Sequence, residues 1–88
     1  METGPEKEDP RLLANQDLDA VVAMFGTGEK MPEAEINELR AGIKDGGEKE
    51  KLSRNIDALV QEMVKIGKNP GKIMVQIAGL RNFIRKLP

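Results

Sequence analysis

Five cationic side chains and no acid lie in residues 68–88: Lys68, Lys72, Arg81, Arg85 and Lys86. Clustered Lys and Arg side chains bind phosphate groups, so this segment is a candidate contact surface for nucleic acid. At 100° per residue, however, Arg81 and Arg85 fall on one flank of the apolar stripe of this segment, and Lys72 and Lys86 fall on the other. This pattern is also typical of long cationic side chains that border a buried helix face.

The residues that most often carry catalysis or hold metals are scarce. The sequence has no cysteine and no histidine, which removes thiolate ligands and the commonest general base. Ser53, Thr3 and Thr27 are the only hydroxyl nucleophiles of their types, and none can have a histidine partner. Fifteen acids permit a carboxylate pair, but a small bundle seldom forms a pocket for one. We expect no enzymatic activity, cofactor, metal or small-molecule substrate.

Composition indicates one small helical domain. The 88 residues are 39% hydrophobic and 33% charged, and only Phe25 and Phe83 are aromatic. The net charge of −1 hides an asymmetry, because residues 1–45 carry a net −6 and residues 46–88 a net +5. The halves could attract each other, or the basic half could face an external anion. No apolar run suits a membrane span and the N-terminus lacks a signal peptide, so we expect a cytoplasmic protein.

Cap residues and apolar spacing divide the chain. We expect a disordered acidic tail over 1–8 and a single helical domain over 9–88, with helices at about 10–25, 32–44, 48–66 and 70–87. Asp9-Pro10 and Asn69-Pro70 each pair an N-cap residue with a proline at the first helical position. The last two helices carry apolar residues at alternating spacings of four and three, in the same phase. A strand over 72–79 is the alternative, since Ile73, Val75 and Ile77 alternate.

The predicted fold is therefore all-α: a small three- or four-helix bundle closed by a C-terminal antiparallel αα-hairpin of residues 48–87. In this hairpin the apolar stripes of the third and fourth helices would pack against each other. The first two helices would then cover the edge that remains exposed.

The predicted function is protein binding. We expect a non-enzymatic regulatory or adaptor module that binds a protein partner, or a second copy of itself, through helix faces. The small-residue face opposite the stripe of the last helix, with Val75, Ala78, Gly79 and Asn82, would make the contacts. Arg81 and Arg85 would steer an acidic partner toward it. The alternative is a nucleic-acid-binding regulator that uses Lys68, Lys72, Arg81, Arg85 and Lys86. Membrane-surface binding is disfavoured, because no interfacial Trp is present.

Overall fold

A computed structural model describes residues 9–26 and 31–88. In these two ranges the chain forms four α-helices and one 3-10 turn, without a strand. The helices are α1 (Pro10–Phe25), α2 (Glu33–Asp45), α3 (Lys49–Lys65) and α4 (Met74–Arg85), and the 3-10 segment η2 (Pro70–Ile73) precedes α4. The predicted all-helical class is confirmed, and residues 72–79 are helical. The predicted acidic tail of residues 1–8 lies outside the described residues.

The two predicted N-cap residues begin α1 and η2. The Asp9 side chain accepts a hydrogen bond from the Arg11 N–H at 2.9 Å, so it caps the first turn of α1. The Asn69 side chain accepts the Gly71 N–H at 2.9 Å in the same way. Gly67 follows α3 with a φ of 82°, a left-handed conformation that favours glycine. The sequence predicts one helix from residue 70, whereas the structure has a 3-10 turn and then α4, with Ile73 outside helical geometry at their junction.

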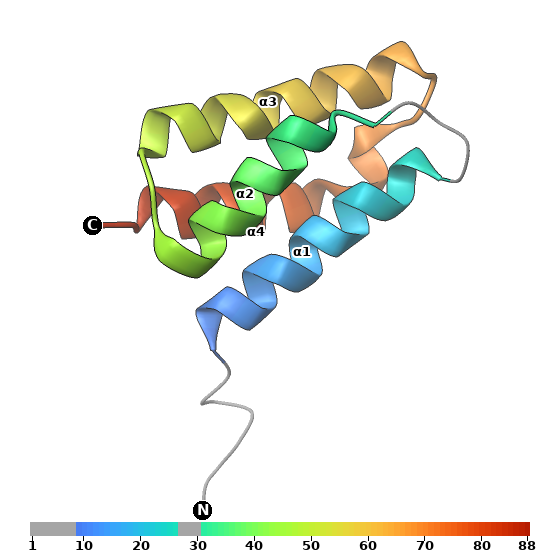
Figure 1. The fold of residues 1–88 in the computed structure, drawn as a ribbon. Coiled ribbons are helices and arrows are strands. Elements are labelled where there is room, and N and C mark those ends of the chain that lie inside the picture. The colour runs from blue at the N-terminus through green and yellow to red at the C-terminus, as the bar shows by residue number, and fades with distance from the viewer. Residues whose placement is uncertain (1–8, 27–30) are drawn as a thin grey trace, which may run out of the picture.

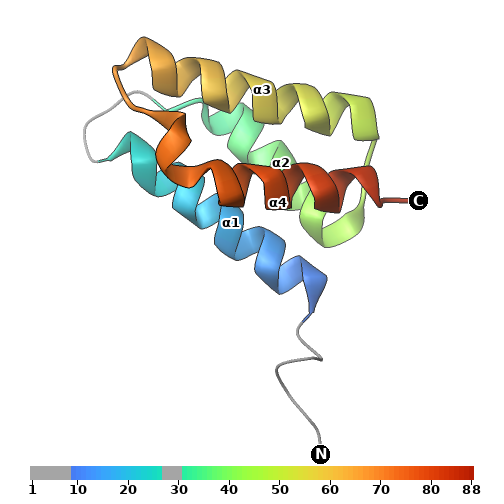
Figure 2. The ribbon, with the colours of Figure 1, turned by 180° about the vertical axis from the view of Figure 1, so that it is seen from behind.

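The four helices pack into one compact bundle (Figure 1). α1 makes its most extensive contacts with α4, and α2 with α3. α3 and α4 also touch, and they run side by side in opposite directions (Figure 2). Because α4 contacts α1 more than it contacts α3, a hairpin of the last two helices is not by itself what closes the bundle. The hairpin as the closing unit stays a prediction.

The apolar stripes of all four helices meet in one core. Its buried members come from every helix: Ala14, Leu18, Val21, Phe25, Ile36, Leu39, Ile43, Leu52, Ile56, Leu59, Met63, Ile73, Ile77, Leu80 and Ile84. These are the positions that helical periodicity selects, since residues three and four apart share a face. Burying such side chains is the main source of stability in a domain of this size.

Two glycines lie where neighbouring helices approach each other closely. Gly42 of α2 is buried against α3, where a Cβ atom would lie 2.7 Å from Leu52 Cδ1. Gly79 of α4 lies against α1, where a Cβ atom would overlap the carboxylate of Asp17. In both cases the missing side chain lets a neighbouring helix approach closely. The apolar stripes do not reveal these contacts, because glycine belongs to no stripe.

One polar contact ties α2 to α3. Asn55 is buried, and its Nδ2 donates a hydrogen bond to Glu38 Oε1 at 2.9 Å. The Lys51 Nζ lies 3.5 Å from the other oxygen of the same carboxylate. The hydrogen bond from Asn55, and secondarily the charge of Lys51, lower the pKa of Glu38 below its ordinary value. One hydrogen bond and one ion pair at the Glu38 carboxylate therefore join α2 to α3.

Candidate functional site

The outward face of α4 carries apolar side chains that the bundle does not cover. Val75 is 80% exposed and Met74 beside it is 62% exposed. Ala78, Asn82 and Arg85 continue this exposed face toward the C-terminal end of the helix. We call Met74, Val75, Ala78, Asn82 and Arg85 the α4 face. Met74 was not singled out from the sequence, because it lies at the junction with the preceding turn, where a continuous helix was expected.

Two residues of the predicted partner-binding set are engaged within the bundle. Gly79 lies against α1 at Asp17. Arg81 lies on the flank toward α3, where its Nη2 is 2.8 Å from Asp57 Oδ1. The structure therefore brings Val75, Ala78, Asn82 and Arg85 together on one exposed face. Gly79 and Arg81 border this face on opposite sides.

The cations of the C-terminal segment do not share one surface. Arg81, Ile84 and Arg85 line a depression together with Lys49, Glu50 and Ser53 of α3. The Lys49 Nζ also donates a hydrogen bond to the Arg85 carbonyl oxygen at 2.9 Å, which satisfies a carbonyl at the end of α4. Lys86, in contrast, lies on the side of α4 that faces α1. This division agrees with the flanks expected from the helical wheel.

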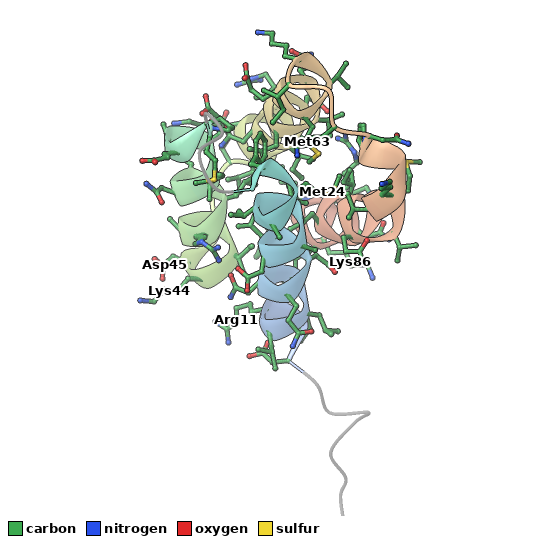
Figure 3. The ribbon with its side chains drawn as sticks, turned by 90° about the vertical axis from the view of Figure 1, so that its right-hand side faces the viewer. Arg11, Met24, Lys44, Asp45, Met63 and Lys86 are labelled. Carbon is green, nitrogen blue, oxygen red and sulfur yellow. The ribbon has the colours of Figure 1, made fainter. Side chains whose placement is uncertain are left out.

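A groove of about 450 Å³ runs between α1 and α4. Its lining residues come from the first half of α1, from α4 and from the two residues that follow α4: Pro10, Leu13, Ala14, Asp17, Gly79, Asn82, Phe83, Lys86 and Leu87. We call it the α1–α4 groove. Figure 3 shows Lys86 on the opposite side of α1 from Arg11 and Lys44, which belong to a different surface of the bundle. The groove is mainly apolar, with Asp17 at one end and Lys86 at the other.

Asp17 is a carboxyl group of the groove whose pKa is perturbed. Its partial burial at the crossing of α1 and α4 raises its pKa above the ordinary value of 3.8. Burial disfavours the charged carboxylate, so the folded protein holds this proton more tightly than the unfolded chain does. Ionisation of Asp17 therefore costs stability once the pH rises above about 4.

Asp17→Asn should accordingly stabilise the fold at pH 7, because the amide carries no charge to desolvate. We expect a gain below about 1 kcal/mol, since the carboxylate is only partly buried and solvent screens it. The gain should disappear near pH 3, where Asp17 is protonated in both the folded and the unfolded chain. Urea unfolding of both proteins at dilute concentration and at the two pH values measures it. A loss of stability at pH 7 would show that the carboxylate makes a favourable contact.

The described residues contain no group of three or more His, Cys, Asp or Glu side chains that could hold a metal ion. None of the helices in these residues has the length and apolar character required to cross a membrane. Comparison with known protein families, with curated proteins and with solved structures finds no significant match.

Proposed function

We propose that the chain is a non-enzymatic regulatory or adaptor module that binds an acidic protein partner through the α4 face. One observation carries the proposal: Val75 and Met74 are adjacent and largely exposed, on a helix that contains no acid. Single exposed apolar residues are ordinary, so we base the proposal on two large ones that lie in the same first turn of one helix, where one partner can cover both. The favourable free energy of covering them is about 25 cal/mol for each Å² of apolar surface removed from water.

The charges around the patch support an acidic partner. Arg85 belongs to the α4 face, and Arg81 borders it. Arg81 is paired with Asp57, so Arg85 is the cation best placed to meet a partner carboxylate. Its Nη2 donates to Asn82 Oδ1, which holds the guanidinium over the face. Positive charge at the rim of an interface mainly accelerates association and selects the partner.

Val75→Glu should abolish capture of the partner, because it places a carboxylate in the centre of the apolar patch. Affinity capture from cells, followed by mass spectrometry, would compare the wild type with this variant. Val64→Glu is the matched control, since Val64 is also exposed, at 59%, but lies on α3. Partners lost with Val75→Glu and retained with Val64→Glu support the proposal. Equal capture by both variants would rule out the α4 face.

Nucleic-acid binding is the second candidate, favoured by the four cations and the absence of acids in η2 and α4 together with Lys86. It is the weaker candidate because Arg81 and Arg85 lie on one flank of α4 and Lys86 on the other. Fluorescence anisotropy with mixed-sequence DNA and RNA at low and physiological salt would test it. Binding that weakens steeply with salt and is lost in Arg81→Glu/Arg85→Glu would favour this candidate over the first.

We also propose that α3 and α4 act as the hairpin that closes the bundle. The two helices run antiparallel and in contact (Figure 2), and the Lys49 side chain donates a hydrogen bond to the Arg85 carbonyl oxygen; both observations support the hairpin. Native-state hydrogen exchange would test the hairpin, because the amides of a closing unit become exposed together when that unit opens.

We propose that the protein resides in the cytoplasm. The absence of cysteine from the sequence is compatible with a reducing compartment.

A further inference from the structure

We propose that the α1–α4 groove is a self-association surface, through which two copies of this chain form a dimer with two-fold symmetry. The groove shares only Asn82 with the α4 face. The dimer is therefore independent of the acidic partner proposed above, and one can fail without the other.

Charges of opposite sign lie at the two ends of the groove. Asp17 lies beside Gly79, and Lys86 follows Gly79 by seven residues. At 1.5 Å per residue, the two charged ends of the groove are about 10 Å apart along α4. A two-fold axis across the middle of the groove places the negative end of one copy against the positive end of the other. The arrangement is thus complementary to itself, and it creates two ion pairs, Asp17 to Lys86 in each direction.

Apolar surface lies between these two charged ends. Leu13 is one helical turn before Asp17 on α1, and Phe83 is one turn after Gly79 on α4. Both side chains line the groove, and Leu13 is 43% exposed. The two-fold axis would pass close to them, so each Leu13 would pack on the Leu13 and Phe83 of the other copy. This places the apolar contact at the centre and the charges at the rim, as in typical interfaces.

The charges of Asp17 and Lys86 and the net charge of the chain also favour pairing of two copies. Neither Asp17 nor Lys86 forms an ion pair with another residue in the described ranges. The chain as a whole has a net charge of −1, so two copies hardly repel each other. Burial in the groove raises the pKa of Asp17, and Lys86 of a second copy would place a cation beside this carboxylate.

The test exploits the two-fold symmetry. Asp17→Lys should place two cations together in both ion pairs, because the new ammonium group would face Lys86 of the other copy. Lys86→Glu should place two acids together in both. Each variant alone should therefore dimerise at least about tenfold more weakly than the wild type.

In an equimolar mixture of the two variants, one of the two pairs joins the two substituted side chains and is attractive again, with its charges exchanged. The other pair joins the unchanged Lys86 of one copy to the unchanged Asp17 of the other, as in the wild type. The mixture should therefore dimerise as the wild type does. Sedimentation velocity on the full chain, with 9.7 kDa for the monomer, measures all four samples.

Leu13→Glu supplies a second measurement, because it places two carboxylates at the centre of the interface and should prevent dimerisation. Leu12→Glu is its control, since Leu12 is similarly exposed but lies on another surface, with Asn15 and Arg40. Circular dichroism verifies that each variant folds. A wild type that stays monomeric up to about 1 mM, the weakest affinity worth considering, would overturn the proposal and leave the groove to another occupant. A mixture that associates no better than its components would also overturn it.

Discussion

Leu18→Ala should destabilise the fold by about 3–5 kcal/mol. Leu18 is completely buried in the centre of α1. Its truncation loses the transfer free energy of three carbon atoms and leaves a cavity that the neighbouring helices fill only in part. A domain below about 90 residues has only a few kcal/mol of net stability, so this change could unfold a large fraction of the molecules.

Thermal unfolding followed by circular dichroism at 222 nm would measure the effect, which corresponds to a fall in Tm of more than about 10 °C for a domain of this size. Leu12→Ala is the matched control: it is the same substitution in the same helix, at a side chain that is 49% exposed. We expect it to stay within about 0.5 kcal/mol of the wild type. Equal losses in the two variants would contradict the assignment of Leu18 to the core.

Gly42→Val should destabilise the fold by about 2 kcal/mol, by overpacking instead of by a cavity. A Cβ atom at Gly42 would lie 2.7 and 2.8 Å from the two Cδ atoms of Leu52. Leu52 is itself buried in the core, so it cannot turn outward without exposing apolar surface. The better helix propensity of valine offsets only a few tenths of a kcal/mol of this strain.

Ala41→Val controls for propensity, because Ala41 is the preceding residue of α2 and is exposed. The double variant Gly42→Val/Leu52→Ala tests the cause, since the smaller side chain at position 52 makes room for the new one. Urea unfolding should show a loss smaller than the sum of the two single losses by more than about 0.5 kcal/mol. Additive losses would mean that Gly42 and Leu52 do not clash.

Local features of the fold could be predicted from the sequence. Asp9 and Asn69 cap helices because their side-chain oxygens reach the backbone N–H two residues on, a contact made within one turn. Ala14, Leu18 and Phe25 are buried as their spacing predicts, since a helix places residues three and four apart on one face. The junction at Ile73 could not be predicted in this way, because a 3-10 turn and an α-helix share similar apolar spacing.

The candidate sites depend on contacts between helices, and there the sequence was less informative. Val75 was expected on an exposed face, and it is among the most exposed apolar residues described. Gly79 was placed on the same face, but it lies against Asp17, because α4 packs mainly on α1. The α1–α4 groove was not predicted at all. The one sign of the groove in the sequence is Leu13, an apolar residue that lies outside the main apolar stripe of its helix.

By itself, the sequence determined the helix caps and the apolar face of each expected helix, and it contains no histidine or cysteine for chemistry, but it left a strand over 72–79 open. Only the tertiary structure decided that α1 pairs with α4 and α2 with α3. The physical reason is that helix formation and capping depend on neighbours within one or two turns, which the sequence displays directly. Four aliphatic stripes of similar width can pair in several ways, and the choice depends on close packing between side chains that are far apart in the sequence.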